Sequence, residues 1–175
     1  NRLFENCTSL ILPPDISNIN EDFLYATFYN CTSLTTAPTL PECATDMMDV
    51  FYGCHSLKTY IGSIAPDGDM SGYRIPNVIY MTNAFADCYS ITHAPAIPNS
   101  VKSLKATFSS CRALVSAPEI PDSVTNMDRT FSQCSSMTGE IKIPCSLASQ
   151  NYKYALCPAT ITYYHVDDCD GSCGK

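Results

Sequence analysis

The 175-residue chain has no tryptophan, few basic residues and no long apolar run. Only 10 lysines and arginines stand against 17 acidic residues, which gives a formal net charge of −7. Nucleic acids and anionic membranes attract basic surfaces, so this balance argues against both as partners. No apolar segment approaches the ~18 residues that a membrane-spanning helix needs, and we therefore expect no membrane insertion of this segment.

Sequence motifs for catalysis are missing too. The chain contains no HExxH pair, no glycine-rich phosphate loop and no nucleophile elbow. Its three histidines, His55, His93 and His165, stand at unrelated positions of the pattern described next. A catalytic group needs a nucleophile, a base and an orienting residue that converge. We therefore expect no enzyme, with no catalytic residue, cofactor or metal ion.

What the sequence does contain is a repeat. Phe-x-x-Cys occurs six times, and successive phenylalanines are 24, 23, 34, 23 and 23 residues apart. An Ala-Pro-x-Leu/Ile-Pro segment follows at 37–41, 94–98 and 117–121. A fixed period of about 23 residues is typical of a solenoid, in which stacked coils bury each other's apolar faces. The repeat predicts two internal columns, formed by Phe4, Phe28, Phe51, Phe85, Phe108 and Phe131 and by Cys7, Cys31, Cys54, Cys88, Cys111 and Cys134.

Each coil is expected to hold one short parallel strand and one short return. The Thr-rich stretch 34–40 suits a strand of two to four residues, because Pro38 cannot donate to a ladder. Apolar spacings of three and four within 123–132 indicate a helical or 3₁₀ return. We thus expect a solenoid of about six coils over residues 1–144, with an insertion near 60–74, and a Cys-rich cap over 145–175.

The motif Phe-x-x-Cys-x-Ser-Leu, followed by a Leu/Ile-Pro-x-Ser-Val segment, resembles the BspA-like leucine-rich repeats of bacterial surface proteins. Residues 124–131 are also similar to repeats of mycoplasma-type surface lipoproteins. The resemblance covers residues 3–144, although Ala-Pro stands where the family's strand carries Ile. It implies an extracellular or cell-surface location, the virion surface included, and a role in adhesion.

The eleven cysteines fall into two groups. Those of the repeat are interpreted as reduced, buried thiols that act as small apolar residues, with raised pKa and no redox or metal role. Pairing between adjacent coils is the alternative, since strand spacing fits the Cα separation of disulfides. Outside the repeat, Cys43 is interpreted as a small residue in a slot that later copies fill with serine. The tail cysteines could form disulfides that hold the cap in place, and they are Cys145, Cys157, Cys169 and Cys173. The weaker alternative is a metal site in which Cys169 and Cys173 join His165, Asp167 and Asp168.

Four further features of the sequence can be interpreted. The β-branched and aromatic stretch 159–166 predicts a strand that pairs with the last coil. The insertion, with loop composition over 60–74, is either a contact loop or a tolerated bulge. Asn6 and Asn30 match the glycosylation pattern but are interpreted first as turn residues, because later copies carry other turn formers there. Tyrosines near the Cys turn form either a recognition stripe or turn packing: Tyr29, Tyr52 and Tyr89.

The outward residues of the strands form a possible binding face that is small, polar and nearly uncharged. We expect it to comprise Thr35, Thr36, Thr39, Thr92, His93, Ala96, Ser116 and Glu119. Such a face suits contact with a protein or a glycan on another surface. The leading hypothesis is a non-catalytic surface module for protein binding and adhesion. The alternative is a structural subunit whose copies stack end to end in a filament or virion.

Overall fold

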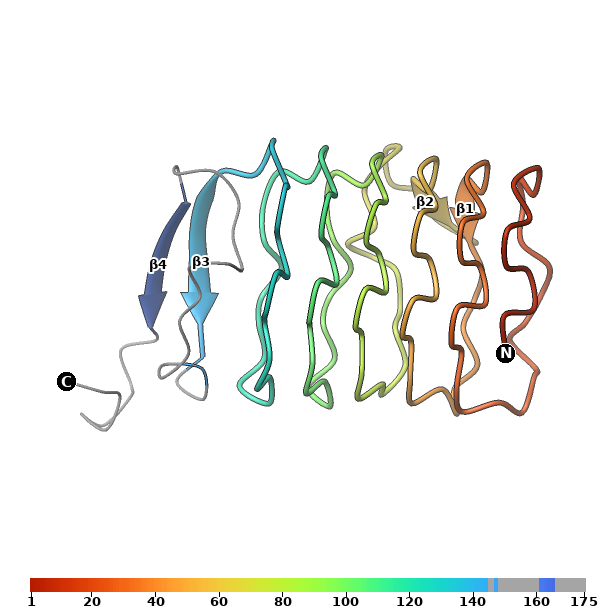
Figure 1. The fold of residues 1–175 in the computed structure, drawn as a ribbon, viewed down its shortest axis with the longest axis horizontal. Helices are drawn as coiled ribbons and strands as arrows, with labels where there is room; N and C mark the ends of the chain where they lie inside the picture. Colours follow the sequence, from red (N-terminus) through yellow and green to blue (C-terminus); the bar gives the residue numbers. More distant parts are fainter. Residues whose placement is uncertain (145–146, 148–160, 166–175) are drawn as a thin grey trace.

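The computed structural model describes residues 1–144, 147 and 161–165. Its coils stand side by side along the long axis, one behind the other in sequence order (Figure 1). We number them 1 to 6 by their repeat phenylalanine. In each coil a return side carries the Phe-x-x-Cys motif, a turn follows, and a strand side carries the Ala-Pro segment or its equivalent.

The strand side is held by very short parallel pairings. β1 (Thr36–Ala37) pairs with β2 (Thr59–Tyr60), and coils further along are joined by single bridges such as His93 to Ser116. The pairing stops early because the proline after the alanine has no N–H to donate. This agrees with the expected strand length of two to four residues.

Coil 6 differs because Glu140-Ile141 replaces Ala-Pro. With both N–H groups available, a five-residue strand β3 (Gly139–Ile143) forms. It pairs in parallel with β4 (Ile161–His165), in a register that runs from Gly139–Ile161 to Ile143–His165. The strand predicted within 159–166 and its pairing with the last coil are therefore confirmed. The tail cysteines, and any disulfide between them, lie outside the described residues.

The return side is not helical, and the expectation of helical or 3₁₀ returns is wrong for residues 1–144. Every second N–H donates to the carbonyl three residues back, as from Thr27 to Leu24 at 3.1 Å. The N–H groups between them donate to the next coil, as from Phe28 to Val50 at 2.9 Å. This alternation produces a series of turns that are hydrogen-bonded to the neighbouring coil. The described part of the chain also holds no helix long and apolar enough to cross a bilayer.

Two residues per coil adopt a left-handed backbone conformation, which explains the alternation. In coil 2 these are Ala26 and Asn30, with φ of 53° and 56°. A positive φ at the third residue characterises type II turns, and Asn, Asp and Gly tolerate it best. The Asn30 slot holds residues with positive φ in every coil, which supports turn chemistry at the two glycosylation-like matches: Asn6, Asn30, Gly53, Asp87, Ser110 and Gln133.

The repeat phenylalanines form one continuous column in the core. Successive rings are stacked, with centroids 5.3, 5.7, 5.4, 5.6 and 5.9 Å apart. Those of coils 2 to 6 are fully buried, and Phe4 of coil 1 is partly buried. Burying each ring contributes roughly 1.5–3 kcal/mol. The column is therefore the largest apolar contribution that the repeat makes to stability.

The cysteines run beside the phenylalanines as a second column, and no disulfide joins any two of the seven cysteines in the described part of the chain. Cys7 is exposed in coil 1, while the other five ladder cysteines are fully buried. Each buried thiol donates to the Phe carbonyl of the preceding coil at 3.0–3.2 Å, as from Cys111 to Phe85 at 3.1 Å. Burial raises the pKa of Cys31 to about 11 and raises that of Cys88 well above its usual value. The buried ladder cysteines are thus thiols that donate hydrogen bonds within the core.

The insertion contributes to the core as well as to the surface. Gly68 donates to the carbonyl of Lys58 at 2.7 Å and accepts from the N–H of Thr92 at 2.7 Å. Coil 3 thereby contributes two hydrogen-bonded chain segments to the strand side, whereas each other coil contributes one. Met70 is fully buried, and Tyr73 is 4% exposed and donates from its hydroxyl to the Pro38 carbonyl at 2.8 Å. Neither a contact loop nor a bulge describes this part of the insertion.

Replacing Phe85 by alanine should lower the free energy of unfolding by about 3–5 kcal/mol, because it opens a cavity in the middle of the ring column. Denaturant titration followed by circular dichroism measures this change. Phe23→Ala is the matched control, since Phe23 is 52% exposed, and it should cost no more than about 0.5 kcal/mol. Equal losses for the two variants would contradict the stacked column.

Thiol reactivity should follow the ladder. In a variant with Ser at the four tail cysteines, a thiol reagent at pH 8 should label Cys7 and Cys43 in the native protein, because both are exposed. The five buried thiols should react only after denaturation, since thiolate is the reactive form and burial suppresses it. Mass spectrometry assigns the labels. Rapid native labelling of Cys88 or Cys111 would show that the ladder is open.

Candidate interaction surfaces

The expected binding face is largely exposed on the strand side. Thr35 and Thr92 are partly exposed, and the fully exposed members are Thr39, His93, Ala96, Ser116 and Glu119. The prediction is wrong for Thr36, because its side chain is buried, with an exposed fraction of 8%. It belongs to β1 and pairs with Thr59, so the neighbouring strand covers it.

Shallow grooves separate neighbouring coils along this side, and the prolines are their cause. The last ladder bond of coil 2 runs from the Ile61 N–H to the Ala37 carbonyl at 3.0 Å. From Pro38 to Cys43 no backbone N–H of this segment donates to another coil, and segments 95–100 and 118–123 behave in the same way. Without ladder bonds, the chain segments are held mainly by the buried aliphatic side chain between the two prolines.

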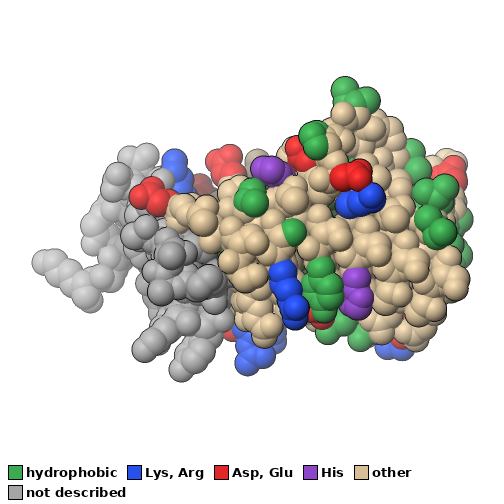
Figure 2. Space-filling view, turned by 90° about the horizontal axis from the view of Figure 1, so that it is seen from above, with side chains coloured by type: hydrophobic (Ala, Val, Ile, Leu, Met, Phe, Trp, Pro, Cys, Tyr) green, Lys and Arg blue, Asp and Glu red, His purple; other side chains and the backbone are tan. Residues whose placement is uncertain are grey.

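Large apolar side chains gather at one end of the strand side. Leu12, Ile61 and Ile64 are 63%, 56% and 102% exposed. Ile61 lines a groove of about 350 Å³ together with Pro14 and Pro38. Leu12 stands two residues before Pro14 in the chain, and Ile64 three residues after Ile61. These five residues are called the apolar surface below. Seen from above, hydrophobic side chains stand out on the N-terminal half of the molecule (Figure 2).

Ion pairs accompany the apolar surface. Lys58 Nζ lies 2.7 Å from Asp67 Oδ2, and Arg74 pairs with Glu42. Both pairs are solvent-exposed, so each contributes little to stability. Asp67 is thus engaged with a lysine, and within the part of the chain that is described no three His, Cys, Asp or Glu side chains gather closely enough to hold a metal ion.

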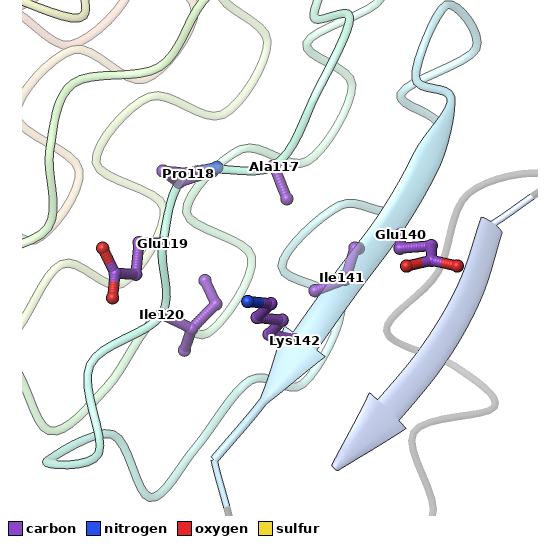
Figure 3. A pocket seen from close by; sticks show the side chains of 7 residues that line it. All are labelled: Ala117, Pro118, Glu119, Ile120, Glu140, Ile141 and Lys142. Atoms are coloured by element: carbon purple, nitrogen blue, oxygen red, sulfur yellow. The ribbon is translucent and has the colours of Figure 1, made fainter. Parts of the chain in front are cut away.

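A second groove, the C-terminal groove, lies where coil 5 meets β3 (Figure 3). It has a volume of about 340 Å³ and a floor that includes Ile120 and Ile141, which are 7% and 2% exposed. Glu119 borders it on the coil 5 side, and Lys142 extends from β3 toward the coil 5 segment. The Thr138 N–H donates to the Val115 carbonyl at 3.0 Å at the closed end. No further ladder bond of this kind joins the two segments, which leaves the groove open.

The tyrosines of the Cys turn pack against each other. Tyr29 and Tyr52 are stacked with centroids 4.8 Å apart, and His55 stacks on Tyr89 at 4.5 Å. The Arg112 guanidinium lies over the other face of the Tyr89 stack, 4.9 Å from that ring's centroid. Figure 2 shows a Lys/Arg, a hydrophobic and a His side chain side by side in one row across this surface. Their flat faces are largely used within the protein, in line with the turn-packing interpretation.

Comparisons with known proteins agree with this architecture. The family model described as BspA type leucine rich repeat region matches in six copies, over residues 1–63 and 75–166. The chain therefore belongs to the BspA-type leucine-rich-repeat family. The unmatched residues 64–74 coincide with the insertion, and the match continues beyond residue 144, where we ended the repeats.

A solved structure shares the fold at low sequence identity. The leucine-rich repeat protein TpLRR of T. pallidum is 23% identical with a TM-score of 0.57, over 77% of this chain and 58% of that one. A leucine-rich repeat protein of Bacteroides ovatus is 18% identical with a TM-score of 0.47, over 76% of this chain and 39% of that one. The chain thus spans about half the length of these proteins. A comparison with curated protein sequences finds no match.

Proposed function

We propose that the chain is a non-catalytic protein-binding module of a cell-surface or extracellular protein, with adhesion as its role. The observation that carries the proposal is the apolar surface. Leu12, Ile61 and Ile64 are each more than half exposed, and Ile61 lines a groove together with Pro14 and Pro38. Contiguous exposed apolar side chains of this kind mark protein interaction sites. Members of the family are typically surface-associated repeat proteins, which supports the location.

The physical layout suits such a role. A hydrophobic centre with a polar rim is the usual anatomy of a protein interface. Here the aliphatic side chains form the centre, while the Lys58–Asp67 and Arg74–Glu42 pairs supply charged groups around it. The rigid stack beneath them limits the ordering that a partner must induce, which lowers the cost of association.

Binding should depend on the apolar surface. In a screen of the purified domain against extracellular matrix proteins and glycans, we expect saturable binding to at least one protein. The double variant Ile61→Ser/Ile64→Ser should weaken that binding at least about tenfold, because hot-spot side chains contribute ~2 kcal/mol or more. Ile79→Ser is the control, being 37% exposed and outside the apolar surface. A silent screen, or equal affinities for the two variants, would refute the proposal.

A second candidate, end-to-end assembly of copies, is favoured by the outer side of coil 1. Leu3 and Ile11 are 56% and 59% exposed there. The N–H of Thr35 in coil 2 donates to the Ile11 carbonyl of coil 1 at 3.0 Å. A strand from another copy could bond to the outer side of coil 1 in the same way. Sheet edges of this kind invite pairing with another chain.

Sedimentation velocity separates the two functions. Assembly predicts concentration-dependent oligomers that Leu3→Ser/Ile11→Ser reduces to a monomer, because polar side chains weaken apolar contact between ends. A single monomeric species up to high protein concentration would exclude assembly and leave the binding module as the function.

A further inference from the structure

The return side carries a hollow that the proposed function does not use. It has a volume of about 460 Å³ and spans coils 1 to 4. Its floor is Ala26, which is 2% exposed and occupies the left-handed slot that holds Arg2, Asp49 and Asn83 in the other three coils. Because the alanine side chain is much smaller than those of Arg2, Asp49 and Asn83, it leaves a hollow at this position. The walls are formed by Arg2, Glu5, Tyr25, Tyr29, Asp49, Tyr52 and Asn83.

The polar groups around the hollow are held in place by one another. Arg2 Nη1 lies 3.1 Å from Glu5 Oε1, and Arg2 Nη2 donates to the Tyr25 hydroxyl at 3.3 Å. Across the floor, Asn83 Nδ2 donates to Asp49 Oδ1 at 2.9 Å. Each of these groups keeps further hydrogen-bonding capacity, since a carboxylate accepts several bonds and a guanidinium donates five. Preorganised polar groups of this kind fix the orientation of a bound ligand.

Two features of this lining select the ligand. Almost every wall residue bears a donor or acceptor and the only aliphatic side chain is that of Ala26, so the hollow suits a molecule rich in hydroxyl groups better than an aliphatic stem. The charge is unequal, because two carboxylates, of Glu5 and Asp49, face one guanidinium already paired with Glu5. Asp49 therefore favours a cationic group on the ligand.

We propose that this hollow binds an amino sugar with a free ammonium group, as in deacetylated glucosamine polymers. The ammonium pairs with Asp49, and ring hydroxyls bond to Asn83, Arg2 and the tyrosine hydroxyls. Tyr29 and Tyr52, stacked with centroids 4.8 Å apart, form a stiff wall beside the sugar. This site is separate from the apolar surface, so a glycan here and a protein there are two independent contacts of the same module.

The matched probes are the glucosamine tetrasaccharide and its N-acetylated counterpart, which share the sugar ring and differ in the charged amine. Because the chain has 11 tyrosines and no tryptophan, tyrosine fluorescence reports on binding, and calorimetry gives the affinity. We expect the free-amine sugar to bind at least about tenfold more tightly, since a charge-assisted hydrogen bond is lost on acetylation. Saturable binding of both with equal affinity, or of neither, would overturn the proposal.

Asp49→Asn should abolish the preference for the amine. The substitution is compatible with the fold, because coil 4 has Asn83 in the same slot with a φ of 53°. Asp128→Asn is the control, as Asp128 is an exposed acid on the return side of coil 6. Tyr29→Phe/Tyr52→Phe keeps the stack but removes two hydroxyls and should weaken both sugars alike. If Asp49→Asn and Asp128→Asn behave identically, the ammonium does not bind Asp49 and the proposal fails, whatever the outcome of the protein screen.

Discussion

The structure depends on the match of each coil with its neighbours. A Phe ring meets a Phe ring at 5.3–5.9 Å, and each buried Cys thiol reaches the Phe carbonyl of the coil before it at 3.0–3.2 Å. Other columns do the same, since Ser100 and Ser123 donate to carbonyls of the preceding coil at 2.6 and 2.7 Å. A coil alone would leave these carbonyls without partners and its ring in water. Stability therefore comes from the interfaces between coils, as expected for a one-dimensional stack.

The prolines shape the outer side of this stack. In coils 2, 4 and 5 a proline directly follows the alanine of the strand side, and the lost ladder bonds open the grooves there. Coil 6 shows the converse, because Glu140-Ile141 in place of Ala-Pro permits the five residues of β3. The C-terminal groove lies between this strand and the coil 5 segment that contains Pro118. Local backbone chemistry thus decides where the surface is closed and where it can receive a partner.

The spacing of the motif predicted the repeat, its two internal columns and the brief strands. When a motif recurs at a constant interval, equivalent residues of successive coils lie on top of one another. The turns of the return side could not be predicted in this way. The left-handed conformation at Ala26 goes against residue preference, and the Ala26 N–H donates to the Met48 carbonyl of the next coil. The buried part of the insertion had a signal that we did not use, since Ile75-Pro76 repeats the Leu/Ile-Pro step of other coils. The hollow over Ala26 had none, because it needs side chains from four coils.

The second chain segment that coil 3 adds to the strand side makes the two sides of the array unequal in length. Between coils 3 and 4 the strand side contains one more chain segment, about 4.8 Å wide, than the return side, where the Phe51 N–H bonds directly to the Ala84 carbonyl at 2.9 Å. The strand side of the array is therefore longer than the return side by about the width of one chain segment. A partner that extends along the strand side meets this additional segment of the insertion between coils 3 and 4, and a partner on the return side does not.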